Sequence, residues 1–416
     1  MSTLNFLHFF VGFIGLVAIA IPFSNNYKII NYRYIFYGII SQLFLAAILL
    51  KLPFVINFFE LLGNGVRILQ NATVEGAGFV FGYPPSDDAS VYRSLLETFA
   101  FGVLPYIIVM SCISAILWHW GILPFIVNII SKACQKLFNI GGPVGLGAAA
   151  NVFIGQVEAP LLIKPYINKL SNKELLILMT AGMATVAGSV MVALISILEV
   201  QFENVNLIQH FLTASILSVP AAIMYANIMI PSNEVTNFDG ASVPKVYESS
   251  MDAITRGTKD GLDICLNVAA ILIAFIALVS LLNSILGICG GWIGISDLSL
   301  QLILGYIFFP IVWLMGVPLS ETLASAELLG LKTALNEFVA YGTLANIEPG
   351  ILSERSKLIT LYALCGFANF SSVGILVSGI SAMAPERKND LIKVSLKALI
   401  GATLASCMTG LVIGIF

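Results

Sequence analysis

Long apolar runs separated by short polar segments dominate the chain. A membrane-spanning helix needs about 20 apolar residues. Runs that reach this length cover residues 4–24, 29–50, 98–120, 174–198, 206–230, 262–284, 357–382 and 392–416. Three more helical patterns, over 53–70, 121–138 and 298–316, are amphipathic and are expected at the membrane interface. The pattern predicts an all-α membrane protein with eight transmembrane helices and interfacial helices.

Two further apolar segments are each interrupted in the middle by polar residues that include a carboxylate. The first covers 143–170 and is broken at 155–160 (GQVEAP), and the second covers 318–347 and is broken from Lys332 to Glu337. Each half is too short to cross a bilayer. We therefore expect two re-entrant helical hairpins, because irregular backbone at membrane depth is tolerated only inside protein or beside a cavity.

The hairpins belong to two copies of one plan: a span, an amphipathic segment, a hairpin and two more spans. The second span in each copy, which follows the hairpin, also carries a polar break, at 185–189 and at 366–372. Three spans separate the hairpins, so the second enters the membrane from the opposite side. This inverted repeat with broken helices is typical of secondary transporters, which bind their substrates near the bilayer midplane.

Composition and charge narrow the function further. Hydrophobic residues make up 58% of the 416 residues and charged residues only 10%, against roughly a quarter charged in soluble domains. A soluble enzyme and a DNA-binding protein are therefore excluded, and no nucleic-acid partner is expected. The sequence also lacks the HExxH, GxSxG and Walker A motifs. If the loop at 25–33 is cytoplasmic, most of the 20 basic residues share its side, which predicts that both termini lie outside.

The carboxylates of the hairpins are the leading functional candidates, because an ionisable residue inside a membrane is costly. Glu158 and Glu337 occupy matching breaks, although buried acids paired with a lysine or a backbone N–H remain the alternative. Glu321 and Glu327 precede the second break and are expected to face solvent or cap a helix. Lys332, at the edge of that break, is the basic residue nearest to either one.

The polar residues around the breaks suit an uncharged solute. Gln156, Asn369, Ser371 and Ser372 offer amides and hydroxyls, but no cation lies at a break to bind a phosphate or carboxylate. We therefore expect a neutral hydroxylated or heterocyclic solute. Phe367 would stack on a ring or simply pack, and Val157 and Val190 would add apolar contacts. Asn151, Thr185 and carbonyls freed at the breaks are oxygen ligands of the kind that hold Na⁺ in transporters.

Several of these segments resemble one known family. Residues 155–160 (GQVEAP) are similar to G-Q-[ST]-E-A-P, residues 336–341 (NEFVAY) match N-E-F-V-A-Y, and residues 365–372 (CGFANFSS) match C-G-F-A-N-x-S-S. Residues 78–82 (GFVFG) are similar to its F-V-F-G segment. In this order along the chain, the motifs resemble those of the concentrative nucleoside transporters, and the length resembles the bacterial-type members.

The resemblance implies a sodium- or proton-driven nucleoside symporter of the cytoplasmic (inner) membrane, built as a homotrimer and working by an elevator movement. It implies Na⁺ as the coupling ion, no other cofactor, and uridine and other pyrimidine nucleosides as substrates. A scaffold would comprise 1–138 (spans 1–3 and interfacial helices) and 231–316 (connecting loop, span 6 and interfacial helix). A mobile transport domain would comprise 139–230 (first hairpin, spans 4–5) and 317–416 (second hairpin, spans 7–8).

Carried over residue by residue, the resemblance also implies a binding site. The base would contact Gln156, Val157, Glu158 and Val190; the ribose would contact Glu337, Asn369 and Ser372; and Phe367 would line the site. Sodium would be held by the Asn151 side chain, the Ile154 carbonyl, the Thr185 hydroxyl and the Val186 carbonyl. Val157 stands where the family has Ser or Thr, which removes a hydroxyl beside the base and leaves the preference between purines and pyrimidines open. A proton-coupled symporter, an intramembrane enzyme using Glu158 and Glu337 as acid and base, and an ion channel are the alternatives.

Overall fold

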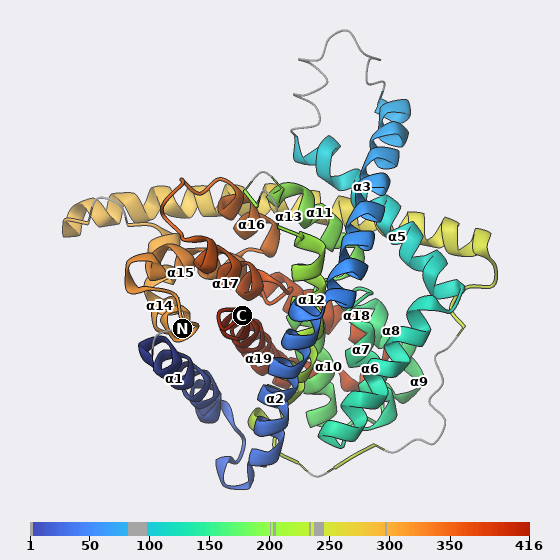
Figure 1. Ribbon diagram of the computed structural model, residues 1–416, viewed down its shortest axis with the longest axis horizontal. Helices are drawn as coiled ribbons and strands as arrows, with labels where there is room; N and C mark the ends of the chain where they lie inside the picture. The colour runs from blue at the N-terminus through green and yellow to red at the C-terminus, as the bar shows by residue number, and fades with distance from the viewer. Residues whose placement is uncertain are drawn as a thin grey trace.

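A computed structural model describes residues 3–81, 98–199, 201–202, 205–232, 234–236, 245–295 and 298–416. Every regular element among these residues is a helix (Figure 1). The outer helices are α1 (Thr3–Ala20), α2 (Tyr32–Lys51), α3 (Pro53–Phe81), α5 (Leu104–His119), α6 (Ile122–Phe138), α13 (Ser250–Ile293) and α14 (Leu300–Leu314). Short 3₁₀ turns at Ile21–Phe23 and Tyr27–Ile29 join α1 to α2, and a π-helical turn at Phe99–Val103 precedes α5.

The remaining helices form the two hairpins and the spans that follow each of them. The first repeat contains α7 (Gly142–Ala150), α8 (Glu158–Leu162), α9 (Lys164–Ile167), α10 (Asn172–Ala184), α11 (Gly188–Leu198) and α12 (Leu207–Met229). The second contains α15 (Leu319–Ala334), α16 (Glu337–Ala345), α17 (Glu354–Leu364), α18 (Phe370–Met383), a 3₁₀ turn at Pro385–Arg387 and α19 (Lys388–Ile413). The two expected hairpins, α7–α8 and α15–α16, and both expected span breaks are therefore present.

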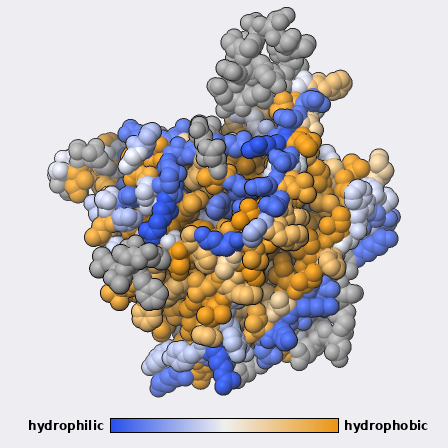
Figure 2. Space-filling view, viewed as in Figure 1, coloured by the Kyte–Doolittle hydropathy of each residue, from blue (hydrophilic) through white to orange (hydrophobic). Residues whose placement is uncertain are grey.

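Burial separates an interior group of helices from an outer group. The apolar windows of α10–α11, α12 and α19 are each 83% buried, whereas those of α2, α5 and α13 are only 6–17% buried. The interior helices α10, α12 and α19 pack on one another, while α13 packs along α5 and α14 along α15. Figure 2 shows the corresponding surface: apolar residues gather over the middle of the face, with polar residues above and below. That band is what a bilayer would cover.

The predicted spans agree with the helices, with differences in length. Among the described residues, six helical segments are long and apolar enough to cross a membrane: 32–51, 99–119, 172–198, 207–229, 250–292 and 385–413. The other two expected spans correspond to α1 with the 3₁₀ turn that follows it, a shorter apolar segment over 7–23, and to the α17–α18 pair, which is divided at its break.

Two predicted boundaries were wrong. The helix expected to end at residue 70 continues as α3 to Phe81. Residues 82–97 lie outside the described part of the chain. The span expected at 262–284 is the 44-residue helix α13, so the connecting stretch at 231–261 is helical from Ser250. Ser249 caps this extension by accepting from the Asp252 N–H, and Asp252 pairs with Arg256 at 2.8 Å. Hydropathy detects the part of a helix inside the membrane, not its polar continuation.

The two broken spans cross at their breaks. Gly366, between α17 and α18, has φ of 129°, a conformation open to glycine and strained for other residues. A Cβ at this position would lie 2.8 Å from the Ala184 carbonyl oxygen at the end of α10. The absence of a side chain at Gly366 thus lets the second repeat approach the broken helix of the first.

Candidate functional site

A cavity of about 360 Å³ lies where the two hairpin tips meet α11, α18 and α13. All eight residues expected to bind substrate line this cavity: Gln156, Val157, Glu158, Val190, Glu337, Phe367, Asn369 and Ser372. They come from segments more than 200 residues apart and from both repeats. The fold therefore brings the eight candidates together at one place, while their individual contacts with a ligand remain predictions.

The second hairpin contributes a connected polar group built on two helix N-termini. Asn336 caps α16 by accepting from the Val339 N–H at 3.0 Å, which places Glu337 in the first turn, where a negative charge is favoured. Asn369 caps α18 by accepting from the Ser372 N–H at 2.8 Å. The Asn369 amide also donates to the Glu337 carboxylate at 3.0 Å. The two caps therefore fix a carboxylate and an amide side by side in the cavity wall.

The first hairpin contributes a tight turn. The Glu158 carboxylate folds back over Gly155 and occupies the space that a Cβ on Gly155 would need. Val157 packs against Gly379 of α18, where a Cβ would lie 2.9 Å from the valine. The Gln156 side chain is buried, and its carbonyl oxygen accepts no hydrogen bond from the described residues. Gln156 therefore keeps an acceptor available beside the cavity.

Helix α13 forms a wall of the cavity that the motif analysis missed. Its lining residues are Asp260, Asp263, Ile264, Asn267, Val268 and Ile271. Their spacing of three and four residues places them on one helix face, so the polar members of this stripe were a detectable signal. With Glu158 and Glu337, they make the lining acidic, and none of its described residues is a lysine or arginine. Such a lining disfavours phosphorylated ligands.

A second cavity of about 480 Å³ adjoins the first, since Gly155, Glu158, Ser189, Asp260 and Ile264 line both. It passes between the first hairpin and α5 and extends to Tyr247, Arg256 and Lys259 near the start of α13. The predicted site therefore connects with the end of α13 that carries Arg256 and Lys259, which the charge pattern predicts to be cytoplasmic.

The residues expected to bind sodium lie together between the first hairpin and the break after α10. The Thr185 hydroxyl contacts the Asn151 carbonyl at 2.9 Å, and the Asn151 amide donates to the Gly147 carbonyl at 2.9 Å. The Asn151 side-chain oxygen is buried and has no hydrogen-bond partner among the described residues. A buried acceptor without a donor is costly, so it suits a cation. Ile154 lies in the hairpin turn and Val186 in the break, where the Val186 N–H donates to Ser215 at 3.3 Å.

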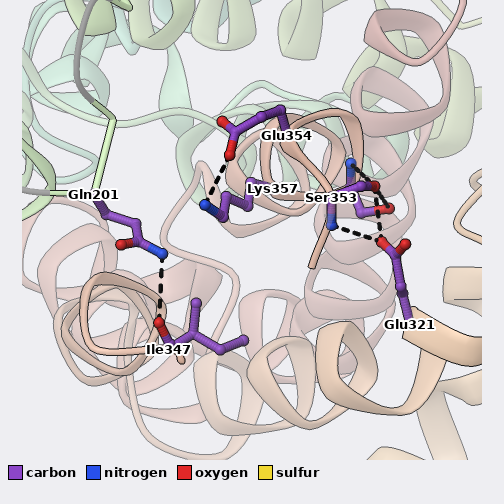
Figure 3. Close-up of polar contacts among 7 residues, drawn as sticks. Gln201, Glu321, Ile347, Ser353, Glu354 and Lys357 are labelled. Atoms are coloured by element: carbon purple, nitrogen blue, oxygen red, sulfur yellow. Dashed lines mark hydrogen bonds and ion pairs between the residues drawn. The ribbon is translucent and has the colours of Figure 1, made fainter. Parts of the chain in front are cut away.

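Two charged residues of the second hairpin, Glu321 and Lys332, lie outside the cavity lining. Glu321 accepts hydrogen bonds from the N–H and hydroxyl of Ser353, at 3.0 and 2.9 Å, and so secures the start of α17, as the capping interpretation expected (Figure 3). Lys332 lies in the last turn of α15, at the edge of the break as expected, and it does not line the cavity. Its side chain is fully buried and donates to the Ala363 carbonyl at 2.9 Å, in the last turn of α17. Hydropathy could not show that a lysine is enclosed by helices distant in sequence.

Three further contacts lie around the second hairpin and the start of α17. Gln201, which follows α11, donates to the Ile347 carbonyl after α16 at 3.5 Å, and Lys357 pairs with Glu354 at 2.9 Å (Figure 3). Phe99 of the π-helical turn meets Phe338 of the second hairpin edge-on, with ring centroids 5.5 Å apart.

Comparison with known proteins gives a consistent result along the chain. The family model for the Na⁺ dependent nucleoside transporter N-terminus matches residues 11–84, that for its C-terminus matches 210–414, and a nucleoside recognition (Gate) model matches 100–201. The nucleoside permease NupC of Helicobacter pylori is 35% identical over 412 residues, covering 98% of this chain and 96% of that protein. The chain belongs to the concentrative nucleoside transporter family. The human sodium/nucleoside cotransporter 1 is 33% identical over 424 residues, covering 97% of this chain and 63% of the human protein.

A solved member of the concentrative nucleoside transporter family has the same fold. CNTnw in an inward-facing, substrate-bound state matches with a TM-score of 0.90 at 33% identity, over 99% of this chain and 97% of that one. The predicted family and all-α membrane fold are confirmed. The relatives are nucleoside transporters rather than enzymes, which excludes the intramembrane-enzyme alternative. Na⁺ is the coupling ion that the family models name.

Proposed function

We propose that this protein is a Na⁺-coupled symporter that imports nucleosides across the cytoplasmic membrane. The observation that carries the proposal is the juxtaposition of two features at the crossing of the repeats. One is the cavity in which Glu337 and Asn369 are held 3.0 Å apart by helix caps. The other is the buried Asn151 side-chain oxygen, which has no hydrogen-bond partner among the described residues and lies at the start of the hairpin turn that supplies Gln156 and Glu158.

The nucleoside would bridge the two repeats. Its ribose hydroxyls would donate to the Glu337 carboxylate and pair with Asn369 and Ser372, while the base would lie against Gln156, Val157, Glu158 and Val190, with Phe367 along one side. Charge-assisted hydrogen bonds of this kind are worth about 1.5–3 kcal/mol each. The acidic lining supports an uncharged nucleoside over a nucleotide. We propose uridine and related pyrimidine nucleosides as the first substrates to test.

Sodium would bind first, at Asn151, Ile154, Thr185 and Val186. A cation there would occupy the free acceptor of Asn151 and hold the turn from 151 to 157 in one conformation. Gln156 and Glu158 follow directly in that turn, so ordering them before the nucleoside arrives would lower the entropic cost of nucleoside binding. Ion and nucleoside would then bind cooperatively.

An elevator movement would carry the loaded site across the membrane. The buried interior helices α10, α12 and α19, with both hairpins, would form the mobile transport domain (139–230 and 317–416). Helices α1, α2, α3, α5, α6, α13 and α14 would form the scaffold (1–138 and 231–316). The second cavity, which extends toward Arg256 and Lys259, supports an inward-facing conformation with both termini outside. We further propose a homotrimer, in which the exposed apolar faces of the scaffold helices would meet.

Uptake of radiolabelled uridine into proteoliposomes tests this proposal. Inward gradients of Na⁺ and of H⁺ would be imposed separately, with adenosine and cytidine as competitors. The proposal predicts concentrative uptake driven by Na⁺ alone and inhibited by cytidine. Uptake driven by H⁺ alone would reject sodium coupling, and a flux without accumulation or counterflow would indicate a channel.

A further inference from the structure

The second repeat contains a buried cation at its broken helix. The Lys332 side chain is 0% exposed. Its ammonium donates to the Ala363 carbonyl at 2.9 Å, in the last turn of α17, and Lys332 itself lies in the last turn of α15. The negative ends of two helix dipoles therefore converge on this ammonium.

No carboxylate compensates Lys332 at contact distance among the described residues. The three ion pairs among the described residues join Arg256 to Asp252, Lys357 to Glu354 and Arg387 to Asp390, and none includes Lys332. Burying an ammonium without a paired anion is costly, so a neutral side chain would serve packing alone better than a lysine does.

In the first repeat, an asparagine rather than a lysine lies where the end of the hairpin helix meets the broken span. Asn151 is the C-cap of α7, and its backbone carbonyl accepts from the Thr185 hydroxyl at the break that follows α10. The Asn151 side-chain oxygen has no donor among the described residues. The first repeat thus presents a spare acceptor where the second presents an ammonium. Broken-helix carbonyls and half-helix C-terminal ends are where transporters place coupling cations.

We propose that the Lys332 ammonium is the built-in counterpart, in the second repeat, of the Na⁺ bound by the first, so that one Na⁺ moves with each nucleoside. Lys332 does not line the cavity and contacts no ligand. It is a positioning residue: its ammonium neutralises the carbonyl end of α17 through Ala363. This inference rests on the proposed sodium-coupled function and adds its stoichiometry.

The test measures Na⁺ and nucleoside fluxes in the same proteoliposomes. The wild-type protein should carry one Na⁺ per nucleoside, with a Hill coefficient for Na⁺ of about 1. Lys332→Gln replaces the ammonium by an amide like that of Asn151. Its uptake at low Na⁺ should fall at least about ten-fold, as expected for losing one charge-assisted hydrogen bond. High Na⁺ should restore uptake with a Hill coefficient approaching about 2, because a second Na⁺ fills the place of the ammonium.

Two controls separate this effect from a loss of structure. Lys332→Arg keeps the charge and should keep the wild-type Hill coefficient. Lys173→Met removes another buried lysine that donates to a backbone carbonyl, that of Ser232 at 2.8 Å, at the start of α10 and away from both breaks. This control should leave the Na⁺ dependence unchanged.

Three results would overturn the inference. They are a wild-type flux of two Na⁺ per nucleoside, an unchanged Na⁺ dependence in Lys332→Gln, or a folded Lys332→Gln protein that Na⁺ does not rescue. The ratio of Na⁺ flux to nucleoside flux in the wild-type protein tests the inference even if Lys332→Gln does not fold. If the wild-type protein accumulates no nucleoside under a Na⁺ gradient, the proposed function itself fails, which is a distinct outcome.

Discussion

Replacing Glu337 by Gln removes one negative charge from the cavity with little change in shape. Glu337 is 5% exposed, and one of its carboxylate oxygens accepts from the Asn369 amide at 3.0 Å. Two ribose hydroxyls bound to this carboxylate would each contribute about 1.5–3 kcal/mol, and hydrogen bonds to a neutral acceptor are roughly half as strong. Glu337→Gln should therefore lose about 1.5–3 kcal/mol of binding free energy, which is about 10- to 100-fold in affinity.

The assay is equilibrium binding of radiolabelled uridine to the purified transporter at saturating Na⁺. Uridine analogues that lack the 2′- or 3′-hydroxyl test the same contact from the ligand side. They should bind more weakly than uridine to the wild-type protein, and the difference should shrink in Glu337→Gln, because the substitution and the missing hydroxyl affect one interaction.

Glu321→Gln is the matched control. Glu321 belongs to the same hairpin but lies outside the cavity. Its carboxylate accepts two hydrogen bonds from Ser353 at the start of α17. Its substitution should change uridine affinity by less than about two-fold, since it touches no ligand. Unchanged uridine affinity in Glu337→Gln, or an undiminished deoxyribose effect, would refute the assignment of Glu337 to the ribose.

Three other substitutions test separate parts of the account. Asn151→Ala removes the unpartnered acceptor and should raise the Na⁺ concentration for half-maximal uptake by about ten-fold; an unchanged value would favour proton coupling. Val157→Thr restores a hydroxyl beside the base and should change the ratio of uridine to adenosine affinity by about 2- to 10-fold, the value of one neutral hydrogen bond; equal effects on both nucleosides would place the base elsewhere. Gly366→Ala places a Cβ 2.8 Å from the Ala184 carbonyl at a φ of 129° and should destabilise the protein by about 1–3 kcal/mol, seen as a lower Tm; an unchanged Tm would show that the crossing of the breaks is loosely packed.

The hairpins and breaks could be predicted from the sequence because their signal is local. A polar residue such as Glu158 or Glu337 within an apolar segment is costly in a membrane unless protein encloses it, so its position marks irregular backbone. The caps act locally too: Asn336 and Asn369 each accept from an N–H three residues later. These local rules place the candidate residues on hairpins and breaks, and the inverted repeat places the two sets near each other.

The remaining features depend on packing between distant segments. The acidic stripe of α13 has helical spacing in the sequence, but its orientation toward the cavity is set by contacts with α5, some 150 residues earlier. The burial of Lys332 could not be predicted, because its hydrogen-bond partner Ala363 lies 31 residues later in the chain. The extension of α13 to Ser250 depends on the Ser249 cap and the ion pair between Asp252 and Arg256, which hydropathy does not detect.

The central claim is that Na⁺ at the first hairpin and nucleoside in the shared cavity stabilise each other's binding. The most direct measurement is uridine affinity in the purified protein over a range of Na⁺ concentrations, together with Na⁺ affinity with and without saturating uridine. The account predicts that Na⁺ tightens uridine binding and that uridine tightens Na⁺ binding by the same factor, about 5- to 150-fold. Both effects should be largely lost in Asn151→Ala. A uridine affinity that does not change with Na⁺ would contradict the account.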